Sequence, residues 1–231
     1  MLPSPAFTDR AAAGAALARV LRRRSLRPPL IVLALPRGGV PVGYEVARAL
    51  HAPLDVMLVR KISLPSEPEL AIGALASGGV VVREMGLARE IPDFEEMFDQ
   101  GVERERPELV RREEAYRSGL AGLNLKGKTV ILVDDGLATG STMLAAIRTA
   151  RQMGAARIIA AAPVASQDAV ALVSAETDEL VILKIPPALF SIGAWYEEFE
   201  QLEDAEVIRL LGLSRRLPND AAGKSRQRRA G

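Results

Sequence analysis

Residues 130–142 constrain the fold more than any other stretch of this chain. The stretch opens with four apolar residues, three of them β-branched, a pattern typical of a strand buried on both faces of a parallel sheet. Two adjacent carboxylates, Asp134 and Asp135, follow at the carboxyl end of this run. Open α/β sheets bind ligands at that end of their strands. The stretch therefore predicts a strand, a ligand-binding loop and the start of a helix.

The loop after the two carboxylates is predicted to bind an anion. It is rich in glycine and hydroxyl residues and runs directly into a helical pattern at Met143. Free backbone N–H groups and the helix dipole favour a phosphate at such a junction. The carboxylates can meanwhile accept hydrogen bonds from vicinal sugar hydroxyls, so the whole stretch predicts a ribose 5-phosphate site. The loop residues concerned are Gly136, Ala138, Thr139, Gly140, Ser141 and Thr142.

Two other phosphate-binding motifs do not fit this loop. No lysine follows Gly140, which excludes a Walker loop. The acidic residues come before the glycines, which excludes the dinucleotide-binding fingerprint. The remaining alternative is an ordinary strand, turn and helix whose acidic residues bind no ligand.

A second glycine loop follows another continuous apolar run, residues 30–35. In this loop Arg37 is followed by Gly38 and Gly39, and a helix is expected from about residue 42 to residue 50. Two adjacent glycines after an arginine let bare backbone approach an anion closely. The loop predicts a second anion-binding turn, and the alternative is a plain turn with a surface arginine.

Residues 130–142 resemble the phosphoribosyl pyrophosphate (PRPP) motif of type I phosphoribosyltransferases at every position. The resemblance implies an α/β fold with a central parallel sheet flanked by helices. It implies that Asp134 and Asp135 hold the ribose hydroxyls, that the loop wraps the 5-phosphate, and that Mg²⁺ arrives bound to PRPP. Residues 68–73 and 193–196 also resemble stretches of a bacterial subgroup of predicted phosphoribosyltransferases.

The second glycine loop resembles the pyrophosphate loop of the same family, in which a non-proline cis peptide is common. The resemblance makes the Pro36-Arg37 bond the expected cis peptide. A basic pair after the strand predicted at residues 54–59 also suits a leaving pyrophosphate, and similar pairs contact PRPP in the orotate branch of the family. A solvated surface role is the alternative for that pair. The expected pyrophosphate-binding residues are Pro36, Arg37, Gly38, Gly39, Arg60 and Lys61.

Two further segments are expected to cover the site. The Pro- and Ser-rich residues 62–69 predict a mobile lid, carried by a hairpin of residues 71–76 and 80–83, so that lid and hairpin span about 62–84. By resemblance, residues 185–200 form a hood that binds the acceptor base. The alternative is that its rings seal the core or a dimer contact. The candidate acceptor contacts are Lys184, Phe190, Trp195 and Tyr196.

The rest of the chain alternates helical and strand patterns, which predicts a parallel sheet covered on both faces. A long charged stretch is expected to be a helix interrupted at Pro107. The expected elements are helices at 11–24, 93–118, 167–175 and 207–213 and strands at 157–162 and 179–184.

Composition excludes several classes of protein. The chain of 231 residues has no Cys and one His, which argues against disulfides and against thiolate or histidine zinc sites. No apolar run reaches the ~20 residues needed to span a bilayer. We expect one cytoplasmic domain over residues 1–213 and a basic, disordered tail over 214–231. Nucleic acid could bind only through this tail.

These observations predict a phosphoribosyltransferase that moves the phosphoribosyl group of PRPP to a nitrogenous acceptor and releases pyrophosphate, with Asp134, Asp135 and Arg37 at the reacting centre. Enzymes for 6-oxopurines usually have Asp where this chain has Ala138, so the loop resembles the adenine and orotate branches. The expected role is salvage of a purine or pyrimidine base by a homodimer. The alternative function is a regulator that binds PRPP without turning it over.

Overall fold

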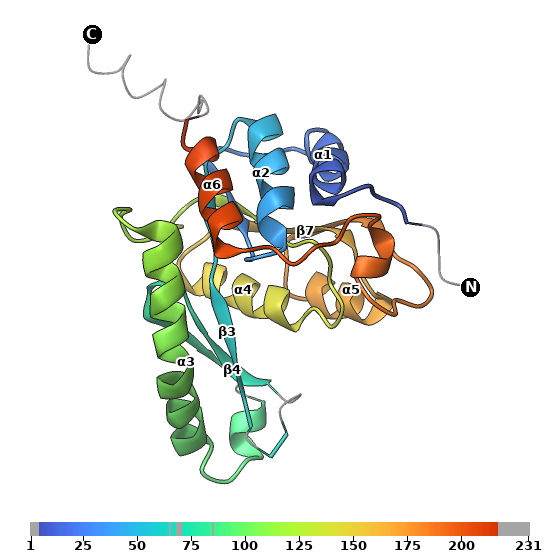
Figure 1. Ribbon diagram of the computed structural model, residues 1–231. Coiled ribbons are helices and arrows are strands. Elements are labelled where there is room, and N and C mark those ends of the chain that lie inside the picture. The colour runs from blue at the N-terminus through green and yellow to red at the C-terminus, as the bar shows by residue number, and fades with distance from the viewer. Residues whose placement is uncertain (1–4, 65, 68–70, 85, 217–231) are drawn as a thin grey trace.

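The central sheet is built from five parallel strands in the order β2-β1-β6-β7-β8. The computed structural model describes residues 5–64, 66–67, 71–84 and 86–216 (Figure 1). The expected lid at 62–69 and the tail therefore lie partly outside the described residues. The strands are β1 Leu30–Ala34, β2 Leu54–Val56, β6 Thr129–Val133, β7 Arg157–Val164 and β8 Glu179–Lys184.

Strand order decides where the two glycine loops meet. The chain winds outward from β1 in one direction to β2 and, after a crossover, in the other direction through β6, β7 and β8. Ala34 pairs with Val133, so the carboxyl ends of β1 and β6 lie level with each other. The winding reverses between these two strands, and this switch point is where open α/β sheets bind ligands.

Helices cover both faces of the sheet (Figure 1). The alternating side chains of each strand contribute to two separate clusters, as a sheet buried on both faces requires. Val32 and Ile131 belong to one cluster, and Leu33 and Leu132 belong to the other. One face carries α1 Arg10–Leu21, α2 Gly39–Leu50 and α6 Asp204–Ser214, and the other carries α4 Ser141–Gln152 and α5 Gln167–Ser174.

The helices that follow the two glycine loops begin earlier than the sequence predicts. The first, α2, starts at Gly39 rather than at residue 42, and it tolerates Pro41 because a proline in the first turn has no N–H to lose. The second, α4, starts at Ser141. Each predicted anion-binding loop therefore ends inside the first turn of a helix, where backbone N–H groups lack intrahelical partners.

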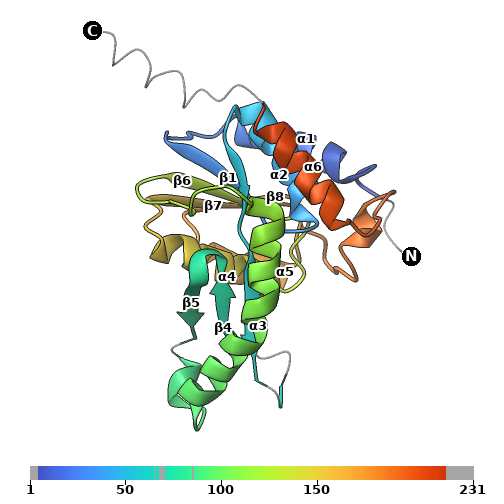
Figure 2. The same cartoon turned by 60° about the vertical axis from the view of Figure 1, so that its left-hand side comes forward.

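A second sheet projects from the main body as an arm (Figure 2). It contains three antiparallel strands in the order β3-β4-β5, and the long helix α3 packs beside it. The predicted hairpin is confirmed, and Gly78 and Gly79 form its turn with φ of 75° and 73°. The elements are β3 Val59–Ser63, β4 Ala71–Ala76, β5 Val80–Arg83 and α3 Phe94–Arg117.

Two predictions about this arm are wrong. The single strand expected at 54–59 is two strands, because the chain leaves the parallel sheet after Val56 and enters the arm at Val59. Arg60 and Lys61 therefore lie within β3 rather than at the end of a core strand. The helix expected to break at Pro107 is continuous. Pro107 faces solvent, where water can bind the carbonyl that loses its helical partner.

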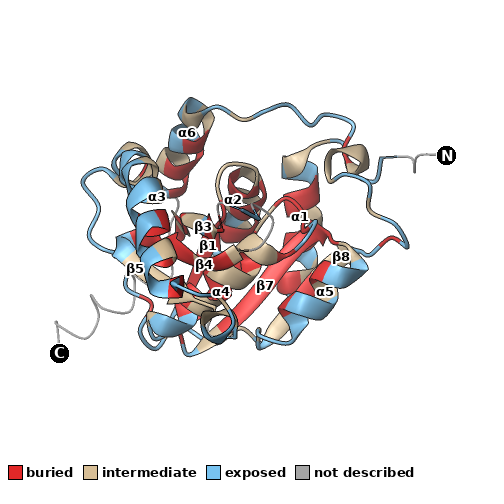
Figure 3. Cartoon of the chain, turned by 90° about the horizontal axis from the view of Figure 1, so that it is seen from below, coloured by how far each residue is buried: buried red, intermediate tan, exposed pale blue. Residues whose placement is uncertain are grey.

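Burial follows this arrangement (Figure 3). The core strands are buried, whereas the outer faces of α3 and α5 are exposed. Arg22, Arg23 and Arg24, which follow α1, are exposed. No helix in the described part of the chain is long and apolar enough to cross a membrane. Within the described ranges, short 3-10 turns lie at Ser77–Gly79, Leu87–Arg89 and Gly193–Trp195.

The arm depends on Phe98, which is fully buried. It stacks on Phe94 with ring centroids 6.0 Å apart, and the Arg83 guanidinium lies over its ring. We predict that Phe98→Ala lowers the free energy of unfolding by about 3–5 kcal/mol, since a large buried ring leaves a cavity. Urea denaturation checks this. The control Val110→Ala, on an exposed position of the same helix, should change stability by less than ~0.5 kcal/mol.

Candidate active site

The two glycine loops are in direct contact at the switch point. A Cβ on Gly38 would lie 2.0 Å from Oδ2 of Asp135, and a Cβ on Gly39 would lie 2.6 Å from the carbonyl oxygen of Val133. Any side chain at these positions would therefore collide with the acidic loop. The backbone N–H of Leu35 donates to the same Val133 carbonyl at 2.8 Å. Sequence analysis placed the two loops near one site, and the structure packs one against the other.

Asp135 is held by a residue that sequence analysis missed. Arg10, at the start of α1, donates from Nε to Oδ2 of Asp135 at 2.8 Å, and both side chains are nearly buried. The Arg10 guanidinium lies 3.7 Å from the ring centroid of Phe199 and donates to the Glu200 carbonyl at 2.9 Å. Oδ1 of Asp135 has no such partner among the described residues. Nothing in the sequence links Arg10 to Asp135, because 125 residues separate them.

Asp134 lies in a different environment. Burial, and then the neighbouring charge of Asp135, raise the pKa of Asp134 well above its ordinary value of 3.8. One of its oxygens accepts a hydrogen bond from the backbone N–H of Asp135 at 2.9 Å. The two acidic side chains are adjacent in sequence, yet Asp135 is paired with an arginine, whereas among the described residues the carboxyl group of Asp134 accepts only a backbone N–H. The pair therefore offers two carboxyl groups with different hydrogen-bond partners.

The loop after the acids lines a hollow of about 200 Å³. Gly140 has a φ of 77°, and the hydroxyl oxygens of Thr139 and Ser141 lie 3.0 Å apart. Within the described residues, the backbone N–H groups of Thr139, Gly140 and Thr142 have no protein acceptor. They lie at the N-terminus of α4, where a phosphate would be favoured. The lining includes Asp134, Asp135, Gly136, Ala138, Thr139, Gly140, Thr142 and Ile192.

The expected pyrophosphate residues lie beside this hollow. The Pro36-Arg37 peptide is cis, as the family resemblance implies. Nη1 of Arg37 lies 3.7 Å from Oδ1 of Asp204, at the start of α6. Arg60 pairs with Glu105 of α3 at 2.6 Å, and Lys61 is exposed. That the positively charged side chains of this group bind pyrophosphate remains a prediction. Three elements, β1, β3 and α3, converge at this place.

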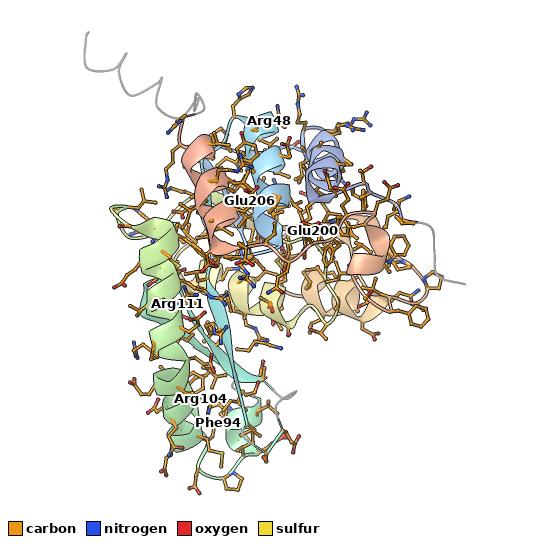
Figure 4. All side chains as sticks on the ribbon, in the orientation of Figure 1. Arg48, Phe94, Arg104, Arg111, Glu200 and Glu206 are labelled. Carbon is orange, nitrogen blue, oxygen red and sulfur yellow. The ribbon has the colours of Figure 1, made fainter. Side chains whose placement is uncertain are left out.

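A second small hollow, of about 20 Å³, lies at this end of the site. It is lined by Pro36, Arg60 and Thr142 and by Arg112, which sequence analysis did not select. The C-terminal half of α3, which carries Arg111, runs beside the main body, whereas its N-terminal half, with Phe94 and Arg104, extends away from it (Figure 4). Charged residues are spread along the whole of α3, so the sequence did not indicate this difference between its two ends.

The candidate acceptor contacts have different environments. Tyr196 is buried, and its hydroxyl donates to the backbone carbonyl of Asp135 at 2.6 Å. This position favours the alternative in which that ring supports the core. Trp195 is half-buried, and its carbonyl accepts from the backbone N–H of Phe7 at 3.1 Å. Phe190 is 79% exposed and Lys184 is exposed, so neither side chain is part of the core.

By itself, the part of the chain that the structure describes does not offer a metal cage. The described residues contain no group of three or more His, Asp or Glu side chains that could hold a metal ion. Asp134 and Asp135 are two oxygen ligands of the kind that Mg²⁺ accepts. Magnesium at this place would take its remaining ligands from a bound diphosphate or from water, which fits the expectation that it arrives with PRPP.

Comparison with known proteins identifies the family. Residues 6–184 match the model of the phosphoribosyl transferase domain. The crystal structure of TT1426 from Thermus thermophilus is 41% identical, covers 89% of this chain and 97% of that chain, and has a TM-score of 0.82. The fold is that of the type I phosphoribosyltransferases, and the chain belongs to the phosphoribosyl transferase domain family.

A longer relative comes from Mycobacterium tuberculosis (strain ATCC 25618 / H37Rv). It is named "Putative phosphoribosyl transferase Rv0571c" and is 41% identical over 210 residues, which cover 91% of this chain and 47% of that protein. The chain thus spans about half the length of the curated relatives it matches. The family model ends at residue 184, so it does not cover the expected hood.

The raised pKa of Asp134 predicts a pH-dependent effect of replacing it. Below the ordinary pKa of 3.8 this group is protonated whether the protein is folded or unfolded, and as pH rises above that value its ionisation costs folding free energy. Asp134→Asn keeps an oxygen for the Asp135 N–H and removes the charge. The variant should therefore gain more stability over the wild type at about pH 8 than at about pH 4.5.

Urea denaturation at several pH values measures this gain. Asp178→Asn is the control, and its expected effect on stability has the opposite sign. Burial raises the pKa of Asp178, but hydrogen bonds from Ile158 and Arg151 outweigh this effect and lower it. That variant should lose stability above the ordinary pKa, and the loss should shrink as pH falls towards the lowered one. An Asp134→Asn gain that is the same at every pH would contradict the assignment.

Proposed function

We propose that this domain transfers the 5-phosphoribosyl group of PRPP to a ring nitrogen of a nucleobase-like acceptor. In this reaction a bond forms between the acceptor nitrogen and C1 of the ribose, the bond from C1 to the diphosphate oxygen breaks, and diphosphate leaves with the electron pair. The acceptor nitrogen gives up its proton to solvent. The observation that carries the proposal is the contact between the two glycine loops at the switch point. One loop can bind a sugar phosphate while the other binds the leaving group.

The proposed roles follow the geometry. Oδ1 of Asp135 and the carboxyl group of Asp134 accept hydrogen bonds from the ribose hydroxyls. The N–H groups and hydroxyls of residues 138–142 bind the 5-phosphate. Arg37, Gly38 and Gly39 bind the diphosphate, with Arg60 nearby. Because little covalent chemistry falls to the protein in such a displacement, its contribution is to position the reactants and stabilise developing charge.

Magnesium supplies additional positive charge at the leaving diphosphate when PRPP is bound. Asp134 and Asp135 are the residues that would lie nearest to it. The N-terminal segment, α1 and the hood meet at the same place, because Arg10 holds Asp135 and the Tyr196 hydroxyl holds its backbone. These contacts keep the acidic loop in one position before any ligand binds, and such preorganisation lowers the cost of binding.

The acceptor is proposed to be an adenine-like or orotate-like base. Ala138 has no titratable group, so the phosphate loop cannot assist a proton transfer on a 6-oxopurine in the way its aspartate-containing relatives do. Phe190 and Trp195 can stack on a base, and such stacking is worth about 1–3 kcal/mol per base. We also propose that the domain acts in base salvage, in the cytoplasm and as a homodimer. Since the chain spans about half the length of its curated relatives, the activity of a protein of that full length belongs to the same proposal.

The deciding experiment mixes the protein with Mg²⁺, PRPP and a panel of purine and pyrimidine bases, and measures diphosphate release. Release that depends on one base would support the transferase. If the protein binds PRPP but releases no diphosphate with any of the bases, the result would instead favour the PRPP-binding regulator. Failure to bind PRPP at all would exclude both functions.

The ribose assignment predicts that Asp135→Asn weakens PRPP binding by about tenfold or more, because a charge-assisted hydrogen bond contributes about 1.5–3 kcal/mol. The variant keeps the shape of the side chain but loses the charge paired with Arg10. Calorimetric titration with PRPP gives the affinity, and thermal unfolding shows whether the fold survives. Asp168→Asn, on the exposed start of α5, is the control and should bind PRPP like the wild type.

A further inference from the structure

The C-terminal half of α3 lies at the diphosphate end of the proposed site. Leu109 and Arg112 line the 20 Å³ hollow together with Pro36 of the cis peptide and Thr142 of the phosphate loop. The side chain of Arg112 is 24% exposed, so it lies at the edge of the hollow rather than in the core. This part of α3 therefore brings a guanidinium next to Pro36 of one anion-binding loop and Thr142 of the other.

Three arginines around this place are each paired with a carboxylate. Arg112 pairs with Glu108 at 2.6 Å, and Arg60 pairs with Glu105 at 2.6 Å. Arg37 lies 3.7 Å from Asp204, as described above. The carboxylates come from α3 and α6, not from the two glycine loops. Each of these three guanidinium groups is thus paired with an acidic side chain of a helix, α3 or α6.

Arg112 and its neighbour Arg111 use their donors differently. Arg111 donates from all three of its nitrogens, to both oxygens of Glu108 and to Asp204. Arg112 donates to Glu108 only from Nε, and within the described residues its two Nη groups have no hydrogen-bond acceptor. Arg111 therefore joins α3 to α6, whereas the terminal fork of Arg112 remains available to a ligand.

Electrostatics agree with this geometry. Hydrogen bonds from Arg111 and Arg112 lower the pKa of Glu108 to about 2, so its carboxylate stays ionised at neutral pH. Burial, and then the hydrogen bond to Asp204, raise the pKa of Tyr116 to about 12, while the charges of Arg112 and Arg37 oppose this rise. Arg112 and Arg37 therefore both lie close enough to Tyr116 to influence one hydroxyl group.

We propose that Arg112 is a diphosphate-binding residue, and that Glu108 holds its place until a phosphate oxygen replaces it. The inference rests on the proposed function, because it assigns a further residue to the diphosphate end of that site. The 20 Å³ hollow has room for about one water molecule. A diphosphate can enter only if the paired side chains turn outward, and the exchange of Glu108 for a phosphate oxygen provides that movement. Arginine suits this role because its planar fork binds phosphate through two parallel hydrogen bonds.

Inorganic diphosphate is the probe for this inference. Calorimetric titration should show that Arg112→Gln weakens diphosphate binding by about tenfold or more, since a charge-assisted pair of hydrogen bonds is lost. Arg106→Gln is the matched control, because Arg106 lies on the same helix in an exposed pair with Glu103 and should leave the affinity unchanged. Glu108→Gln should tighten binding severalfold, because a competing anion is removed.

Ribose 5-phosphate distinguishes ligand binding from a structural effect. Its proposed site is the 200 Å³ hollow, whose lining does not include Arg112, so Arg112→Gln should bind it with the wild-type affinity. Arg112→Met, which keeps the apolar stem of the side chain, should show the same selective loss of diphosphate binding. Thermal unfolding of each variant confirms that folded proteins are compared. If one of the two Arg112 variants does not fold, the other still provides the test.

Several results would overturn the inference. They are a diphosphate affinity of Arg112→Gln or Arg112→Met within twofold of the wild type, an equal loss of affinity for ribose 5-phosphate, or weaker binding by Glu108→Gln. The proposed function fails separately. A wild-type protein that binds diphosphate through Arg112 but forms no nucleotide with any base would refute the transferase and leave the diphosphate site standing.

Discussion

The close packing of Gly38 and Gly39 against the acidic loop is the constraint on which the rest of the site depends. A side chain at Gly38 would overlap the carboxylate of Asp135, so the two loops can meet only because that position has no Cβ. This contact requires β1 and β6 to be neighbours with level carboxyl ends, which the parallel register provides. The fold therefore positions the site through strand order and two small residues.

The ion pairs of the site give its polar residues different environments. Asp135 is paired with an arginine, whereas burial and then the neighbouring charge of Asp135 raise the pKa of Asp134, so two chemically identical side chains lie in different environments. The arginines at the diphosphate end are likewise paired with carboxylates before any ligand is present. A site whose charges are already balanced can remain partly buried without ligand, and an incoming anion exchanges partners instead of neutralising isolated charges.

The arm gives this domain a feature that the parallel sheet alone does not supply. Strand β3 follows directly from β2, so the chain passes from the core into a separate antiparallel sheet within a few residues. Helix α3 returns along that sheet and brings its C-terminal half to the main body. Phe98 secures the far part of the arm, while Arg111 and Tyr116 join the near part to Asp204 of α6. Hydrogen bonds therefore join the arm to the main body at the diphosphate end of the proposed site.

The sequence by itself determined the local features, because their information is contained in short stretches. The strand before Asp134, the glycine loops and the hairpin turn at Gly78 were predicted, since apolar runs and glycines act through neighbouring residues. Only the tertiary structure decided that Arg10 holds Asp135, that Tyr196 supports it, that Arg60 lies in a second sheet and that Arg112 lines a hollow beside Thr142. These contacts join residues far apart in the chain, and strand order and helix packing, which no local pattern encodes, bring them together.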